Sequence, residues 1–217
     1  MTLFHETQGR CPVCFSSVIL KKLRSTEGYV AFDLDYRVYA RGADPVRLLI
    51  QRCDSCQYTE YVTDFLKDVS PAVPDCMARN DYRALLKASR SSDFPLVALI
   101  KAAKDEGPER LAYCYLRASW FAGDLGRAAE EEQYLHQARE QFQRALSGAA
   151  DSVNAADSGR LRTTYMLAEI HRRLSLWEEA RAYLREVDSL EFAVLVRDQF
   201  NLIQRKDALR RRAKSSR

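Results

Sequence analysis

The amino-acid sequence predicts an α+β fold that is mostly α, with a small β domain first and helices over the rest of the chain. Two Cys-x-x-Cys pairs enclose a stretch in which apolar and polar residues alternate, which is the period of a strand. Asp68–Asp75 contains two prolines and little periodicity, and it marks a change of composition. Beyond it, apolar residues recur at helical spacing. We therefore divide the chain into residues 1–70, 71–204 and a basic tail, 205–217.

Length and composition are those of an ordinary globular protein. The 217 residues suffice for one large domain or two small ones, and 47% are hydrophobic and 29% charged. The longest apolar runs, such as Pro95–Ile100, are much shorter than the roughly 20 residues that span a bilayer, so we expect no membrane span. Met1–Cys14 lacks the apolar segment of a secretory signal, so we expect a cytoplasmic protein.

Several short strands are expected in the N-terminal part. Val18–Leu23 is predicted as the first of them, and residues 30–38 alternate strictly enough to form one long strand with one apolar face. Arg41–Pro45 has the composition of a turn. Val46–Gln51 is predicted as the next strand, and Tyr58–Val62 continues beyond the second cysteine pair.

Three charged residues share the polar face of the long strand. Asp33, Asp35 and Arg37 are spaced two apart, so successive side chains would lie about 7 Å from one another. One interpretation is a carboxylate pair for acid–base chemistry or for binding a cation. The other is a solvated face with an Asp–Arg ion pair, packed on neighbouring helices. Because the sequence places no histidine or further acidic cluster beside them, we favour the second interpretation.

The two cysteine pairs predict a metal site. Cys11, Cys14, Cys53 and Cys56 are arranged with 38 residues between the pairs, and a two-residue gap lets both sulfurs of a pair face one ion. Zn(II) suits such a site because it is redox-inert and accepts four sulfurs at tetrahedral angles. A redox-active pair and an iron–sulfur cluster are the alternatives. We expect one structural zinc ion per chain, within a zinc ribbon over residues 8–66. Four thiolates leave no open position, so this metal would not be catalytic.

Helical segments are expected from the proline-containing stretch to the C-terminus. Pro95 and Pro108 lie near two of the predicted starts, where a missing N–H group costs no hydrogen bond. Residues 147–158 are polar and are expected to connect two helices. The predicted helices cover residues 76–89, 95–104, 108–122, 126–146, 159–174, 178–187 and 190–212.

Residues 167–187 resemble a tetratricopeptide repeat (TPR). Ala168 and Ala180 occupy the two small positions where the paired helices meet, and Trp177 begins the second helix. His171 and Ser175 replace the usual tyrosine and glycine. The resemblance implies a TPR-like array of helical hairpins with a concave groove. Leu111-Ala112-x-x-Tyr115 resembles the first helix of another copy. With both copies aligned, the first helices would line the groove with Arg110, Tyr113, Arg117, Tyr165, Glu169 and Arg172.

A resemblance also covers most of residues 8–190. Between and after the cysteine pairs stand Phe32-Asp33-x-Asp35-x-Arg37, Asp44-Pro45 and Leu116-Arg-Ala-Ser-Trp120. This order resembles an uncharacterised bacterial family in which a zinc ribbon precedes TPR-like helices. The chain departs from the family where glycine usually follows each pair, because Phe15 and Gln57 stand there, at positions that often need a positive φ.

These patterns favour a non-catalytic adaptor or scaffold for protein–protein interaction, and not an enzyme. The sequence contains no Walker loop, GxGxxG or GxSxG motif. The arginines among the groove residues favour an acidic or carboxylate-terminated segment of a partner protein.

Two other functions are also consistent with the sequence. One is a nucleic-acid-binding regulatory protein that uses the ribbon and the basic tail. Since the whole chain carries +4 and residues 205–217 carry +6, residues 1–204 carry −2, and such binding would be weak and salt-dependent. The other is a thiol redox sensor that loses zinc on oxidation.

Overall fold

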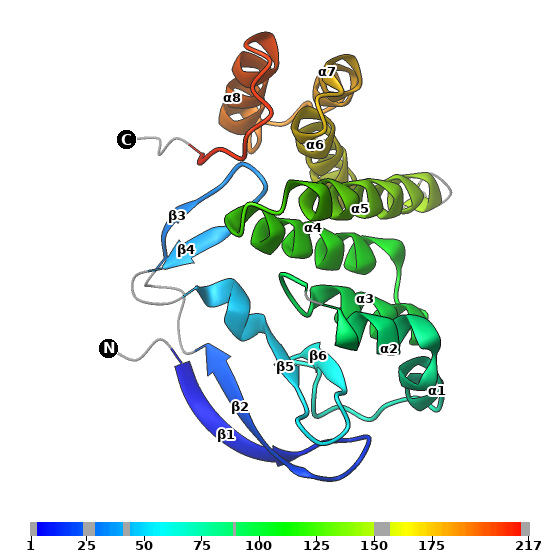
Figure 1. The fold of residues 1–217 in the computed structure, drawn as a ribbon. Coiled ribbons are helices and arrows are strands. Elements are labelled where there is room, and N and C mark those ends of the chain that lie inside the picture. The colour runs from blue at the N-terminus through cyan, green and yellow to red at the C-terminus, as the bar shows by residue number, and fades with distance from the viewer. Residues whose placement is uncertain (1–3, 24–28, 41–43, 89, 150–156, 214–217) are drawn as a thin grey trace.

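The computed structural model describes residues 4–23, 29–40, 44–88, 90–149 and 157–213. Helices follow one another from α1 at one end to α7 and α8 at the other, with the short strands along one side (Figure 1). The described strands form three antiparallel pairs: β1 (Phe4–Arg10) with β2 (Ser17–Leu23), β3 (Tyr29–Phe32) with β4 (Val38–Ala40), and β5 (Ile50–Arg52) with β6 (Thr59–Tyr61). The helices are α1 (Ala72–Ala78), α2 (Asn80–Lys87), α3 (Phe94–Ala103), α4 (Pro108–Asp124), α5 (Ala128–Ala149), α6 (Asp157–Arg173), α7 (Trp177–Arg185) and α8 (Ala193–Gln204).

The class that the sequence predicts is confirmed, since the chain is α+β and mostly helical with small strand pairs near the N-terminus. The strand predicted at Val18–Leu23 is β2. It pairs along its whole length with β1, in a register that runs from Phe4 opposite Leu23 to Arg10 opposite Ser17. The sequence analysis missed β1, because FHETQGR contains too few apolar residues to show a period of two.

Two strand predictions are wrong. Residues 30–38 do not form one strand, because β3 ends at Phe32 and the chain turns before β4 begins. Asp33 N donates to the Arg37 carbonyl at 2.8 Å, and Tyr36 closes the turn with a φ of 63°. Residues 45–49 form a 3₁₀ helix, η1, where the sequence predicts a strand. Pro45 begins η1, and Asp44 caps it by accepting a hydrogen bond from Val46 N at 3.0 Å.

The helical predictions hold except at the two ends of the helical part. Residues 76–89 contain parts of two helices, because the chain is extended at Arg79 between α1 and α2. The last helix ends at Gln204, and the chain then runs without helix to Ala213. The predicted turn at 41–45, the connection at 147–158 and the tail at 205–217 each lie partly outside the described residues, at 41–43, 150–156 and 214–217.

Hydrophobic packing crosses the boundary drawn at residue 70. One core cluster combines Cys11 and Cys53 with side chains of α1, α2 and α3, including Val73, Tyr82 and Leu96. A second cluster joins Val46 of η1 to side chains of α4 to α8, and the aromatic residues of the β3–β4 turn and β6 pack against it. The division at residue 70 therefore separates strands from helices but not one hydrophobic core from another.

Candidate functional site

The two cysteine pairs lie in matching loops at the ends of two hairpins. The first loop joins β1 to β2, and Phe15 N donates to the Cys11 carbonyl at 2.9 Å. The second joins β5 to β6, where Gln57 N donates to the Cys53 carbonyl at the same distance. Phe15 and Gln57 adopt φ values of 62° and 67°, so the expected positive φ is confirmed at both. This left-handed residue turns each loop back so that both of its sulfurs face the other loop.

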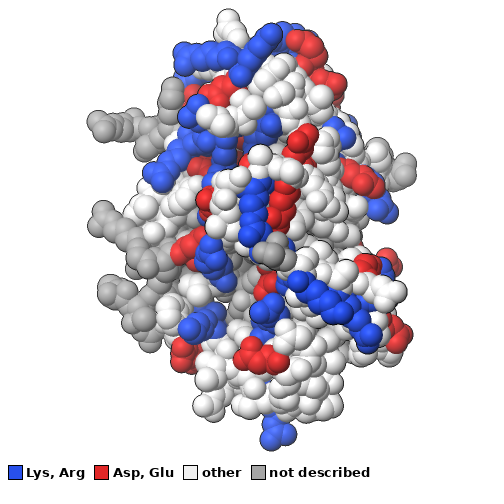
Figure 2. Space-filling view, viewed as in Figure 1, with Lys and Arg blue, Asp and Glu red and all other residues white. Residues whose placement is uncertain are grey.

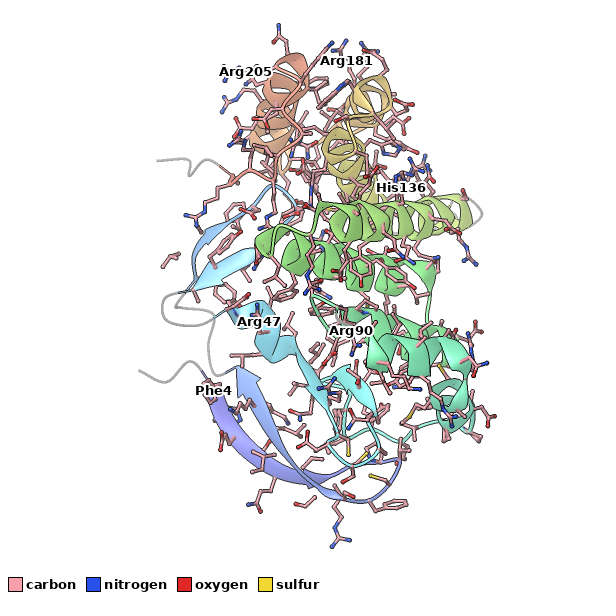
Figure 3. All side chains as sticks on the ribbon, viewed as in Figure 1. Phe4, Arg47, Arg90, His136, Arg181 and Arg205 are labelled. Atoms are coloured by element: carbon pink, nitrogen blue, oxygen red, sulfur yellow. The ribbon has the colours of Figure 1, made fainter. Side chains whose placement is uncertain are left out.

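All four sulfur atoms converge on one point. The Sγ atoms of Cys11, Cys14, Cys53 and Cys56 lie within 4.8 Å of one another, and Figure 3 draws sulfur atoms in yellow where the two hairpin ends meet. Cys11 Sγ is 3.6 Å from Cys56 Sγ, and Cys14 Sγ is 3.7 Å from Cys53 Sγ. A tetrahedron with metal–sulfur bonds of about 2.3 Å has sulfur–sulfur edges of about 3.8 Å, whereas a disulfide requires about 2.05 Å. The four cysteines can therefore hold one metal ion.

The thiols differ in how readily they lose a proton. Burial raises the pKa of Cys11 and of Cys56. The hydrogen bond between the side chains of Cys14 and Ser16 lowers the pKa of Cys14 to about 6. A divalent cation would hold all four as thiolates, so binding at neutral pH would release protons from the buried members.

Side chains of the helical part hold the second loop in place. Tyr82 of α2 is fully buried, and its hydroxyl donates to the Gln57 carbonyl at 2.8 Å. Glu60 of β6, also fully buried, accepts from Lys104 at 2.6 Å and pairs with Lys101 of α3 at 3.3 Å. The second cysteine loop is thus supported from α2 and α3 by hydrogen bonds as well as by apolar packing.

Three of the six predicted groove residues lie together. Arg110, Tyr113 and Arg117 of α4 line a cleft of about 170 Å³ with Lys101 and Tyr61. Arg117 is half-buried; it donates to the Tyr61 hydroxyl and lies over the rings of Tyr61 and Tyr113. Arg110 is exposed and pairs with Glu106 at 2.8 Å.

The other three predicted groove residues are buried, so their assignment to an open groove is wrong. Tyr165, Glu169 and Arg172 of α6 have no exposed surface. Arg172 binds both carboxylate oxygens of Glu169, at 2.6 and 2.8 Å, and donates to the carbonyls of Asp207 and Leu209. The segment after α8 returns over this face of α6 and covers it. These three residues are closed to a partner while this segment is docked on α6.

The polar face predicted at Asp33, Asp35 and Arg37 is not solvated, because all three residues are at most 3% exposed. Asp35 Oδ2 accepts from Trp120 Nε1 at 2.6 Å and from Arg173 at 2.8 Å. Arg37 binds both carboxylate oxygens of Asp124, at 2.6 and 2.9 Å. The predicted packing on neighbouring helices is confirmed. Instead of pairing with one another at the surface, Asp35 and Arg37 belong to a buried network that joins the β3–β4 turn to α4 and α6.

Part of the basic tail is paired with acidic side chains, either of the body or of the tail itself. Arg210 pairs with Asp33 at 3.1 Å and with Asp124 at 2.5 Å, and Arg211 pairs with Asp207 at 2.7 Å. Over the face drawn in Figure 2, acidic and basic side chains are interspersed. These pairs reduce the positive field that the composition of residues 205–217 implies.

One family model matches most of the chain. The family described as "Uncharacterized protein conserved in bacteria (DUF2225)" matches residues 4–194. The chain belongs to this family. The matched region contains the four cysteines, the buried network and the Arg117 cleft, and it ends just inside α8. Neither a curated protein nor a solved structure matches the chain. None of the described helices is long and apolar enough to cross a membrane.

Proposed function

We propose that this family member is a non-catalytic protein-interaction adaptor, in which a structural zinc ion stabilises the N-terminal part and the Arg117 cleft captures an acidic segment of a partner protein. The metal part rests on the cysteine geometry. Four sulfurs at tetrahedral spacing suit Zn(II) and fill its coordination shell, which leaves no position for water or substrate. Zinc in such a site supplies folding energy and no chemistry.

The helical part of the proposal rests on the packing of α6 on α7. Ala168 and Ala180, the two small residues of the TPR-like pattern, are both fully buried. Small residues at such a contact let two helices approach closely, which favours the TPR-like arrangement. Arrays of this kind present a surface to partner segments.

The binding proposal rests on the contacts of the Arg117 guanidinium. Within the described part of the chain, no carboxylate lies within ion-pair distance of its guanidinium, which is held over the rings of Tyr61 and Tyr113. Lys101 and Arg110 also line the cleft, and both are paired with Glu106. A partner carboxylate would find a partly desolvated guanidinium already oriented by aromatic rings, where a charge-assisted contact is stronger than on an open surface.

Metal content is the first test of the proposal. Purified protein should contain one zinc ion per chain and no iron. Iron, or no bound metal in protein that still has native circular dichroism, would refute the zinc assignment.

Peptide binding is the second test. A fluorescent hexapeptide of alternating Asp and Glu with a free C-terminal carboxylate should bind the full chain, and R117Q should weaken it about tenfold or more, since charge-assisted bonds contribute about 1.5–3 kcal/mol. R181Q, at a half-exposed arginine of α7 that lies 3.7 Å from Glu178, is the matched control and should change nothing. Equal affinity for the R117Q and R181Q variants would place the interface elsewhere. Arg172 is left out of the test because it is buried.

A further inference from the structure

The residues after α8 form a strand-like strap on the edge of β3. The C-terminal strap comprises residues 208–213. Leu34 N donates to the Arg211 carbonyl at 2.9 Å, and Ala213 N donates to the Phe32 carbonyl at 3.0 Å. Asp33 and Arg212 face one another as an antiparallel bridge between the two hydrogen bonds. This is β-strand addition, the mode by which many proteins bind an extended peptide.

The strap is held by two arginines: Arg172 of α6 donates to the Leu209 carbonyl at 3.0 Å, and the strap's own Arg210 enters an acidic slot formed by Asp33, Asp124 and the carbonyl of Trp120. Besides its pairs with the two carboxylates, Arg210 donates to the Trp120 carbonyl at 3.1 Å. Arg212 lies over the Tyr39 ring, 4.8 Å from its centre. The strap thus presents arginines at alternate positions, the first half-buried in the slot and the second stacked on an aromatic ring.

The slot is built into the fold. Arg37, whose side chain is 4% exposed, fixes Asp124 through both carboxylate oxygens, and Tyr39 donates to Asp33 at 2.6 Å. Burial alone would raise the pKa of Asp124, but hydrogen bonds from Arg37 and Arg210 outweigh it and hold the pKa below its ordinary value. The Asp124 carboxylate is thus ionised and oriented by a residue that does not belong to the strap.

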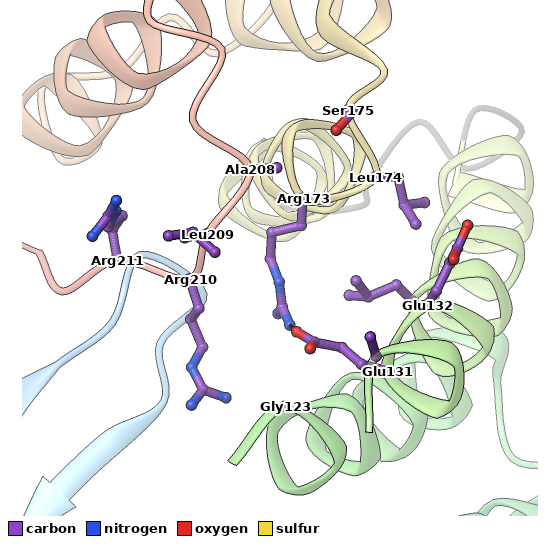
Figure 4. A pocket seen from close by; sticks show the side chains of 12 residues that line it. Gly123, Glu131, Glu132, Arg173, Leu174, Ser175, Ala208, Leu209, Arg210 and Arg211 are labelled. Carbon is purple, nitrogen blue, oxygen red and sulfur yellow. Dashed lines mark hydrogen bonds and ion pairs between the residues drawn. The ribbon is translucent and has the colours of Figure 1, made fainter. Parts of the chain in front are cut away.

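The strap, by contrast, lies at the periphery and fills its site incompletely. Leu209 is 63% exposed, and Arg211 and Arg212 are exposed as well. A cavity of about 570 Å³ extends beside it, between the strap and the ends of α4, α5 and α6; Figure 4 shows Arg210 and Leu209 on one side of this space and Arg173 with Glu131 across it. The family match covers every residue of the slot and ends at residue 194, so the strap lies outside the matched region.

We propose that the acidic slot at the β3 edge is a binding site for an extended arginine-bearing segment of a partner protein, which the chain's own strap occupies until the partner displaces it. This surface is separate from the Arg117 cleft and takes a segment of opposite charge. The strap acts as an intramolecular competitor, since a tethered segment competes at an effective concentration of the order of millimolar. A partner segment can bind more tightly than the strap by also filling the neighbouring cavity.

The experiment uses the full chain and a fluorescent peptide with the sequence of residues 206–213, acetylated and amidated, measured by fluorescence anisotropy. The unaltered chain should bind it weakly because its own strap is docked. R210A weakens the strap but leaves the slot intact, so this variant should bind the peptide at least tenfold more tightly. Adding D124N should reverse that gain, whereas adding E178Q, at an 81% exposed glutamate, should not. A peptide with lysine at positions 210 and 212 should bind more weakly, because lysine cannot make the forked contact.

Three results would overturn the proposal: peptide binding that R210A does not strengthen, binding that D124N leaves unchanged, or equal binding of the arginine and lysine peptides, which would indicate a merely electrostatic attraction. A second measurement needs no substitution. In the unaltered chain, the amide protons of Leu34 and Ala213 should exchange with solvent by a local opening, well before those buried in α4. Exchange of both only through global unfolding would make the strap a permanent part of the fold. R117Q should not affect either readout, so this proposal and the proposed function can fail separately.

Discussion

The buried pair between Asp35 and Arg173 gives the sharpest test of how this fold is held together. The substitution R173M keeps most of the side-chain volume and removes the charge. Asp35 would then remain at the centre of the protein with no exposed surface, one oxygen still bound to Trp120 Nε1 and the other, Oδ1, without a partner. Leaving a buried charge uncompensated costs about 3–5 kcal/mol, a large part of the 5–15 kcal/mol by which domains are stable.

A matched control is available in α7. Arg181 also pairs with a glutamate, but its side chain is 36% exposed and the Glu178 partner is 81% exposed, at 3.7 Å. R181M should therefore cost less than about 1 kcal/mol. Urea unfolding of the metal-loaded protein, followed by circular dichroism, would measure both variants. With a slope near 3 kcal/mol/M, R173M should lower the midpoint by about 1 M or more, and R181M by a few tenths.

A second substitution isolates the electrostatic part of this loss. In the R173M background, D35N removes the stranded charge while its amide oxygen can still accept from Trp120. The double variant should be more stable than R173M alone by more than about 1 kcal/mol, and the single variant D35N completes the double-mutant cycle that gives the coupling energy. Equal losses for R173M and R181M, or a double variant less stable than R173M, would refute the view that Arg173 compensates the buried Asp35 carboxylate.

Two further predictions concern the core around the cysteines and the buried His171. C53S, or removal of the metal by a chelator, should unfold both cysteine loops and release protection from hydrogen exchange in α1–α3, which share their core, while α4–α7 keep theirs; loss of protection throughout would mean that the two cores unfold as one. His171 is buried, which lowers its pKa, so below the ordinary value of 6.5 only the unfolded chain gains this proton. The free energy of unfolding should therefore fall as pH drops from 7.5 to 5.5, and H171F should flatten that slope, as titration of denaturant midpoints would show.

The metal site could be predicted from the sequence because its determinants are local. A two-residue gap fixes how two sulfurs turn toward one point, and the loop that achieves this needs the same positive φ at Phe15 as at Gln57. Helices could be predicted for a similar reason, since the apolar period of 3.6 is a property of each segment by itself. Two helix ends could not be predicted, because the sequence has no strong stop signal at Arg79 or after Gln204.

The buried network could not be predicted, because its partners lie far along the chain. Asp35 and Arg173 are 138 residues apart, and Arg37 and Asp124 are 87 apart. An alternation of acidic and apolar residues is the ordinary pattern of a half-exposed strand, and periodicity contains no information on what covers its polar side. The same limit explains the groove. Arg172 has the spacing of an open helix face, and only the return of the chain 35 residues later closes it.

The positions of the two cores also decide how the metal and the strap act on the molecule. The cysteine site is built into the core of α1–α3, whereas the acidic slot belongs to the network that joins the β3–β4 turn to α4 and α6. A metal ion bound at the cysteine site would therefore stabilise α1–α3 and the cysteine loops, whose described residues form no ion pairs with the strap. The C-terminal strap in turn ties the last residues to Asp33 and Asp124, and so closes the helical part on itself without help from the metal. If the chain is an adaptor as we propose, this division would let it exchange the occupant of its slot while its cysteine site stays folded.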